Sequence, residues 1–249
     1  MQKSRNNGFT LVELAIVMTI IGLLVGGVLK GQQLMENARI TATIKQHNSQ
    51  KAALVLFKDT YNYLPGDLPN ARARLKNCTA SNACYNGDGN NRVGVFITSW
   101  ASDPYDDSPL TTENTQFWKH LAAADMIGGV SPQASVPAWN ETHPSAPFGG
   151  GFRIVDTNHL GIGGTNGSLM SRLVTPITGP VRLARNQNPV NSNIAMRIDN
   201  KIDDGVAATG SVQASSASDG TGCRFPSGVD QFYNPTNTDN DCIIGFFIQ

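Results

Sequence analysis

An apolar run near the N-terminus constrains this chain more than any other feature. The run extends from Phe9 to Leu29 and contains a single charged side chain, Glu13. About 20 helical residues cross the hydrocarbon core of a bilayer, so the run predicts a membrane-spanning helix. Lys3 and Arg5 precede it and no acidic residue stands among the first eight, which favours an N-terminus left in the cytoplasm.

Two simple interpretations of the run leave something unexplained. A secretory signal peptide has a shorter apolar core that ends at a small-residue cleavage site. Here the run is longer, and Gly8 stands before it rather than after it. A plain membrane anchor fits the length, but it does not explain Glu13, because a carboxylate within the bilayer costs roughly 2.5–3.5 kcal/mol.

The residues around Glu13 carry a resemblance to a known family. A short basic leader that ends at Gly8, then FTLVEL and an apolar helix, resembles the N-terminal signature of type IV pilins and pseudopilins over roughly residues 1–45. The resemblance implies that a prepilin peptidase cleaves between Gly8 and Phe9 and methylates the new N-terminal Phe9. It also implies that the Phe9 amine of a neighbouring subunit pairs with Glu13 during assembly. The alternative is a carboxylate that reaches the membrane interface without a partner.

The same resemblance sets the expected domains and the fold class. No glycine or proline occurs between Gln32 and Leu64, so the helix should continue beyond the membrane until the YLPGD sequence ends it. We therefore expect a leader at 1–8, a membrane helix at 9–30, an amphipathic continuation at 31–63 and a periplasmic head at 64–249. The expected fold is pilin-like α+β, with the long helix packed on a small antiparallel sheet.

Within the head, the sequence predicts two further helices and several strands. Residues 112–127 should form a helix capped by Thr112. Residues 191–205 favour a helix with Gly205 as its C-cap, although alternating apolar residues there also fit a strand. The strand-like runs are 151–156, 173–184, 210–214 and 243–248.

No enzyme is indicated by the sequence. The formal net charge is zero and 15% of residues are charged, so no overall field favours nucleic acid, although DNA uptake stays open. Four histidines lack metal-ligand spacing and are expected at the surface, and the acidic residues of 197–205 are expected to be solvated. The histidines are His47, His120, His143 and His159.

One polar loop indicates a possible calcium site. Asn237, Asp239 and Asp241 stand at alternate positions, which is the spacing that opens many calcium loops. Cys242 follows where a glycine is expected, and no glutamate closes the loop. The alternative is a polar turn, since asparagine and aspartate favour turns. Residues 86–91, NGDGNN, carry a weaker version of the same signal.

Four cysteines lie beyond the membrane helix, in what the expected orientation makes the oxidising periplasm. Three connectivities are possible, and sequence alone does not choose among them. Spacing favours Cys78–Cys84 and Cys223–Cys242, because each pair encloses one polar, turn-rich loop. The second pair also resembles the disulfide-bounded C-terminal loop of many type IV pilins.

The resemblance implies a structural subunit of a type IV pilus-like or type II secretion pseudopilus filament. Its partners would be the prepilin peptidase, an inner-membrane assembly platform and other pilin or pseudopilin subunits, of the same or different kinds. The chain would cross the bacterial inner membrane once, and an assembled pilus would place it at the cell surface. The alternative function is a minor or tip pilin whose head binds a glycan, DNA or a secreted protein.

Overall fold

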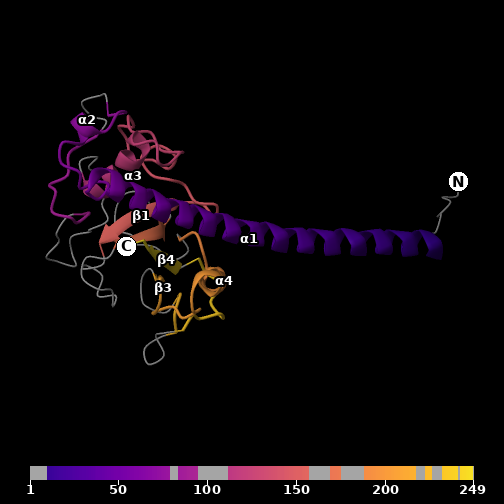
Figure 1. Ribbon diagram of the computed structural model, residues 1–249. Helices are drawn as coiled ribbons and strands as arrows, with labels where there is room; N and C mark the ends of the chain where they lie inside the picture. The colour runs from indigo at the N-terminus through magenta and orange to yellow at the C-terminus, as the bar shows by residue number, and fades with distance from the viewer. Residues whose placement is uncertain are drawn as a thin grey trace, which may run out of the picture. The chain divides into compact units, whose positions relative to one another are not determined.

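The structure is a computed structural model, and it describes eight stretches of the chain (Figure 1). The chain divides into two compact units, Met1–Thr41 and Ala42–Gln249. All structural statements below concern the described stretches. These are residues 10–78, 84–94, 112–156, 169–174, 188–216, 222–225, 232–240 and 242–248.

The first element is a helix of 51 residues, α1 (Leu11–Tyr61). The predicted helix reached residue 63, so its end was placed two residues too late. Asn62 adopts the left-handed conformation with a φ of 57°, and this residue stops the helix before Pro65 can do so. The Arg74 guanidinium donates to the Tyr61 carbonyl at 2.8 Å, so a terminal carbonyl that the helix leaves unpaired is satisfied.

Four antiparallel strands form one sheet in the described part of the head, which confirms the predicted α+β class. The strands lie in the order β1-β2-β4-β3, so β2 and β4 are central. Phe246 of β4 lies opposite Ser171 of β2 and Val212 of β3. The three side chains therefore share one face of the sheet. The strands are β1 (Gly151–Asp156), β2 (Leu169–Val174), β3 (Val212–Ser216) and β4 (Cys242–Phe247).

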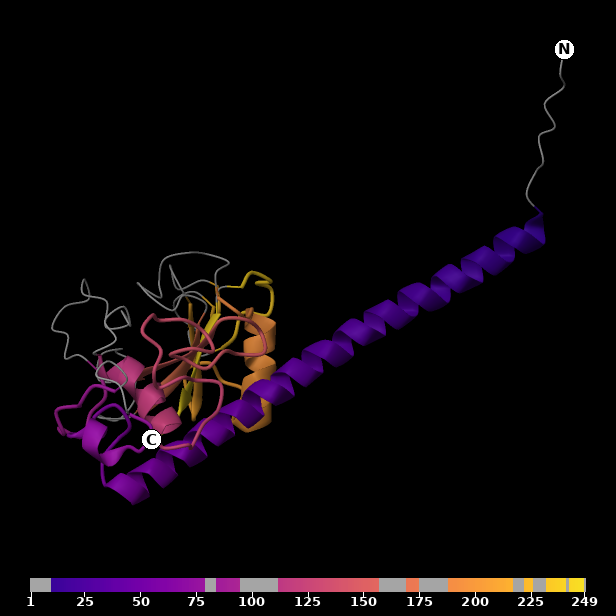
Figure 2. The ribbon, with the colours of Figure 1, turned by 90° about the horizontal axis from the view of Figure 1, so that it is seen from above.

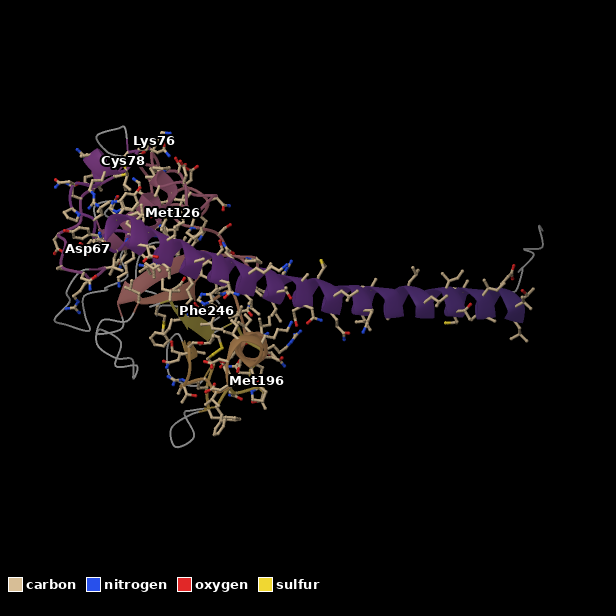
Figure 3. The ribbon with its side chains drawn as sticks, in the orientation of Figure 1. Asp67, Lys76, Cys78, Met126, Met196 and Phe246 are labelled. Carbon is tan, nitrogen blue, oxygen red and sulfur yellow. A yellow bond between two sulfur atoms is a disulfide. The ribbon has the colours of Figure 1, made fainter. Side chains whose placement is uncertain are left out.

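The part of α1 around His47 and Gln50 packs on this face (Figure 2). The His47 ring stacks on Phe246, which Figure 3 labels, with 4.7 Å between ring centroids. The Ser171 hydroxyl donates to the Gln50 side-chain oxygen at 3.1 Å. Further along α1, the Phe57 side chain is fully buried. Along this part of α1, the polar side chains of His47 and Gln50 therefore come first, and the apolar side chain of Phe57 follows.

Three shorter helices complete the described elements: α2 (Ala71–Arg74), α3 (Glu113–Ala123) and α4 (Ser192–Ile202). The prediction of a helix after Thr112 is confirmed, but α3 ends four residues earlier than expected. Asp125 adopts the left-handed conformation, and the Met126 N–H donates to the Leu121 carbonyl at 3.0 Å. These are the features of a Schellman motif, which a non-glycine residue supplies here.

Residues 192–202 are helical, which settles the alternative between helix and strand. The Asn191 side chain caps α4 by accepting from the Ile194 N–H at 3.0 Å. Asp203 occupies the C-cap position, so the prediction of Gly205 as the cap is wrong. Gly205 instead has a φ of 74° in the following turn, and its N–H donates to Asp199.

The predicted strands agree with the sheet to different degrees. The 151–156 run coincides with β1, and the runs at 210–214 and 243–248 lie within two residues of β3 and β4. The run at 173–184 was placed too late: β2 starts at Leu169 and ends at Val174, so only residues 173 and 174 are shared. The rest of that run lies outside the described residues.

Two disulfides join Cys78 to Cys84 and Cys223 to Cys242, the pairs that spacing favours. Cys242 is the first residue of the central strand β4, and its N–H donates to the Val190 carbonyl at 3.1 Å. The second disulfide therefore ties the loop before β4 to the sheet itself. Both sulfurs of this pair belong to fully buried residues.

Candidate functional site

The N-terminal part of α1 presents apolar side chains to its surroundings on all sides. From Leu11 to Leu29, every large apolar side chain is exposed, with exposed fractions of 48% to 89%. Soluble proteins rarely expose contiguous apolar surface of this extent, which marks a membrane or protein contact. The helix is long and apolar enough to cross a membrane. Figure 3 shows its side chains radiating from the ribbon.

Glu13 lies in the first turn of α1 and is bound to Thr10 through three hydrogen bonds. The Thr10 N–H and the Thr10 hydroxyl both donate to the same Glu13 carboxylate oxygen, at 2.9 and 2.8 Å. The Glu13 N–H in turn donates to the Thr10 hydroxyl at 3.3 Å. This reciprocal arrangement of threonine and a glutamate three residues later is a capping box. Gly8 and Phe9 lie outside the described residues.

A second group of polar residues forms inside the head, where Asp67, Asp88 and Glu113 each place an oxygen within 4.8 Å of the other two. Asp67, which Figure 3 labels, is fully buried. Its carboxylate accepts from the three successive backbone N–H groups of residues 89–91, at 2.7, 3.0 and 2.7 Å. Burial raises the pKa of Asp67, and these donors oppose that effect.

Glu113 anchors the other side of the same loop. Its carboxylate accepts from the Asp88 N–H at 3.2 Å and from the Gly94 N–H at 3.1 Å. Gly66 makes the close approach possible, because a Cβ there would overlap the Glu113 carbonyl oxygen. Together, Asp67 and Glu113 fix the backbone of residues 84–94 from two directions. The carboxylates could also hold a hard cation such as calcium.

The acidic residues at the end of α4 form a third group, with one oxygen each of Asp199, Asp203 and Asp204 within 4.8 Å of one another. The prediction that these acids are merely solvated is wrong for Asp199, which is fully buried and accepts from the Tyr233 hydroxyl at 2.9 Å. Asp204 accepts from the Val206 N–H, and Asp203 accepts from the N–H groups of residues 211 and 212. The group therefore shapes the turn that leads into β3.

The predicted calcium loop is described only in part, because Asp241 lies outside the described residues. The Asp239 N–H donates to the Asn237 side-chain oxygen at 2.8 Å. This contact between residues two apart is an Asx turn. The described half of the loop therefore has the geometry of the alternative interpretation, a polar turn.

The prediction of surface histidines is wrong for the three that the structure describes. His47, His120 and His143 are buried, with exposed fractions of 5%, 0% and 0%. His159 lies outside the described residues. His47 lies on the face of α1 that contacts the sheet. The sequence spacing did not predict which face of the helix this would be.

His120 is held neutral by its contacts. The Gly66 N–H donates to Nδ1 at 2.9 Å, so the proton resides on Nε2, which donates to the Tyr85 carbonyl at 2.9 Å. Burial lowers the pKa of His120 to about 4. Burial, together with the nearby positive charge of Lys51, lowers the pKa of His47 to about 4 as well. Each neutral ring should stabilise the folded head above pH 6.5, and this contribution is lost as the pH falls toward 4.

Two acids, the half-buried Glu113 and the buried Asp199, act in the opposite direction. Burial raises the pKa of Glu113 to about 7 and that of Asp199 to about 6. Their contribution to stability is present at low pH and is lost as the pH rises through these values. The histidines and the acids therefore offset one another between pH 4 and 7, and the wild-type head should show a shallow pH dependence there.

We expect the His120 ring to titrate near pH 4 in the folded protein, and NMR detection of its ring protons measures this directly. A Glu113→Gln, Asp199→Asn variant removes these two contributions, so that among the acids named here only Asp67, whose pKa is also raised by burial, still opposes the histidines. The free energy of unfolding should then decrease by up to about 3 kcal/mol per buried histidine between pH 7 and pH 4. A His120 pKa near the free value would contradict the hydrogen-bonded arrangement at Nδ1.

Comparison with known proteins gives one positive result, at the N-terminus. Residues 3–29 match the prokaryotic N-terminal methylation motif, the signature of type IV pilins and pseudopilins. The matched segment contains Gly8, Phe9 and Glu13. The signature is that of structural proteins of the prepilin-processed class, which are typically not enzymes. No curated protein and no solved structure matches the chain.

Proposed function

We propose that this chain is a structural subunit of a type IV pilus-like or type II secretion pseudopilus filament. The observation that carries the proposal is the methylation motif at residues 3–29, of which residues 11–29 lie on a helix whose large apolar side chains are exposed all round. Residues 1–8 are the leader, 9–30 cross the inner membrane, 31–63 continue the helix and 64–249 form the periplasmic head.

Processing prepares the subunit for assembly. Prepilin peptidase cleaves between Gly8 and Phe9 and methylates Phe9, which leaves a positive amine four residues before Glu13. Charged groups within a bilayer normally pair with one another. The Phe9 amine of one subunit pairs with the Glu13 carboxylate of the next as the helices stack into the fibre core.

Assembly replaces lipid contacts with helix contacts. An assembly platform in the inner membrane extracts the apolar half of α1, and neighbouring subunits of the same or another kind then cover it. The small residues Gly22, Gly26, Gly27 and Gly31 leave open space at their Cβ positions, so helices can approach closely there. The head stays on the outside of the fibre, in the periplasm or at the cell surface.

The copy number of the chain in sheared filaments tests this function. Mass spectrometry of purified filaments should find the chain as an abundant component that contains Phe9 as its first residue. Absence of the chain from every filament preparation, despite correct processing, would contradict the structural role.

The calcium site at Asn237, Asp239 and Asp241 stays a prediction. If these residues bind calcium, a concentration of 100 times the dissociation constant should stabilise the head by about 2.7 kcal/mol by mass action. Thermal unfolding in calcium and in chelator measures the effect, with Asp239→Asn and Asp67→Asn as separate variants. Stabilisation that survives Asp239→Asn and disappears with Asp67→Asn would assign the ion to the other group of carboxylates.

A further inference from the structure

The Thr10 side chain contributes twice to the start of α1, and this suggests a role beyond the processing signal. Its hydroxyl accepts from the Glu13 N–H at 3.3 Å and donates to the Glu13 carboxylate at 2.8 Å. The Thr10 N–H donates to that same carboxylate oxygen at 2.9 Å. One threonine therefore binds both the backbone and the side chain of Glu13.

These bonds matter because of where the helix begins. The first four N–H groups of an α-helix have no partner within the helix. Water satisfies such groups in a soluble protein, whereas an unpaired polar group near hydrocarbon costs several kcal/mol. The Thr10–Glu13 capping box satisfies two of these N–H groups, and it directs the carboxylate back along the helix axis toward the N-terminus.

We propose that Thr10 is a positioning residue that holds the Glu13 carboxylate at the helix N-terminus until assembly. The stored subunit thereby carries an internal partner for its intramembrane acid. This orientation also favours assembly, because the Phe9 amine of the neighbouring subunit then meets a carboxylate that already faces the N-terminal end of the helix. This inference rests on the proposed pairing of Glu13 with a neighbour's amine.

Substitutions at Thr10 separate the hydroxyl from the rest of the side chain. Thr10→Val keeps the shape and removes both hydroxyl bonds, whereas Thr10→Ser keeps them. Thr60→Val is the matched control, since the Thr60 hydroxyl donates to the Leu56 carbonyl of its own helix at 2.7 Å. All variants are first checked by mass spectrometry for cleavage before Phe9, so that a defect in processing is recognised.

Two measurements then test the inference. In the full-length mature protein in lipid nanodiscs, amide hydrogen exchange at Glu13 should accelerate about fivefold in Thr10→Val and stay unchanged in Thr10→Ser and Thr60→Val, as the loss of a helix cap requires. In cells, the sheared-filament pool of Thr10→Val should decrease by a similar factor. In a Glu13→Ala background, Thr10→Val should reduce that pool no further, because Thr10 acts through Glu13.

The outcomes distinguish this inference from the proposed function. Wild-type exchange at Glu13 in Thr10→Val would overturn the capping role, whether or not filaments form. A further decrease in the Glu13→Ala background would show that Thr10 acts independently, and it would overturn the positioning role. Absence of filaments in the wild type itself would instead contradict the proposed function, and the exchange measurement would still decide the cap.

Discussion

Replacement of Glu13 by alanine should leave the subunit in the membrane and strongly reduce, without abolishing, its assembly into filaments. The change removes a carboxylate whose presence in the bilayer costs roughly 2.5–3.5 kcal/mol, so insertion should be at least as favourable as in the wild type. In the filament, the Phe9 amine of the neighbouring subunit would lose its partner. If the lost pairing weakens the contact between subunits by about 1.4 kcal/mol or more, the association constant falls at least about tenfold. The sheared-filament pool should decrease accordingly.

Fractionation of cells into membrane and sheared-filament pools measures both effects. Asp59→Ala is the control, since Asp59 is an exposed acid on the same helix but lies in its continuation beyond the membrane span. That variant should behave as the wild type in both pools. Filaments at the wild-type level in Glu13→Ala would contradict the pairing of charges on which the assembly mechanism depends.

Loss of the Cys223–Cys242 disulfide should have the largest effect on the stability of the head. The enclosed loop has a sequence separation of 19, for which the chain-entropy model gives about 3 kcal/mol. Cys242 also begins the central strand β4, so without the disulfide the loop before this strand would no longer be tied covalently to the sheet. For a head of this size, the melting temperature should decrease by about 6–12 °C. Cys242→Ser should also leave Cys223 as a reactive thiol.

The smaller disulfide supplies the comparison. Cys78 and Cys84 have a sequence separation of 6, and the same model gives about 2 kcal/mol for a loop of that length. Thermal unfolding should therefore rank Cys84→Ser between the wild type and Cys242→Ser, and peptide mapping without reduction should find the two disulfides intact in the wild type. A link between Cys78 and either Cys223 or Cys242 would contradict the pairing.

The sequence predicted those features that depend on local pattern. The long helix α1 follows from an apolar run and the absence of helix breakers up to the YLPGD sequence. Helices α3 and α4 follow from their apolar spacing, and three of the four strands follow from short apolar runs. The predicted caps were less accurate, because Thr112 makes no side-chain capping bond and Asp203, not Gly205, is the C-cap of α4. The end of α1 was missed by two residues because Asn62 adopts a left-handed conformation, which asparagine permits but does not require.

The interior of the head could not be predicted in the same way, because its polar contacts join residues far apart in sequence. Asp67 stands in the YLPGD sequence that was recognised only as a helix stop, yet it binds a loop 22 to 24 residues later. His120 was expected at the surface because no ligand spacing surrounds it, whereas its partner Gly66 lies 54 residues earlier. Local sequence does not reveal which polar residues a distant loop will bury. The Thr10–Glu13 capping box, in contrast, was readable from its spacing but was interpreted only as part of the processing signature.

The mature N-terminus tests the central claim most directly. Mass spectrometry of the protein purified from a host with an active prepilin peptidase should give a chain that begins at Phe9 and carries one methyl group on its amine. A Gly8→Ala variant, which changes the residue before the cleaved bond, should be expressed in the same host, and its mature N-terminus should be compared with that of the wild type. A mature wild-type chain that still begins at Met1, or that begins at Phe9 without methylation, would contradict the account of this protein as a prepilin-type subunit.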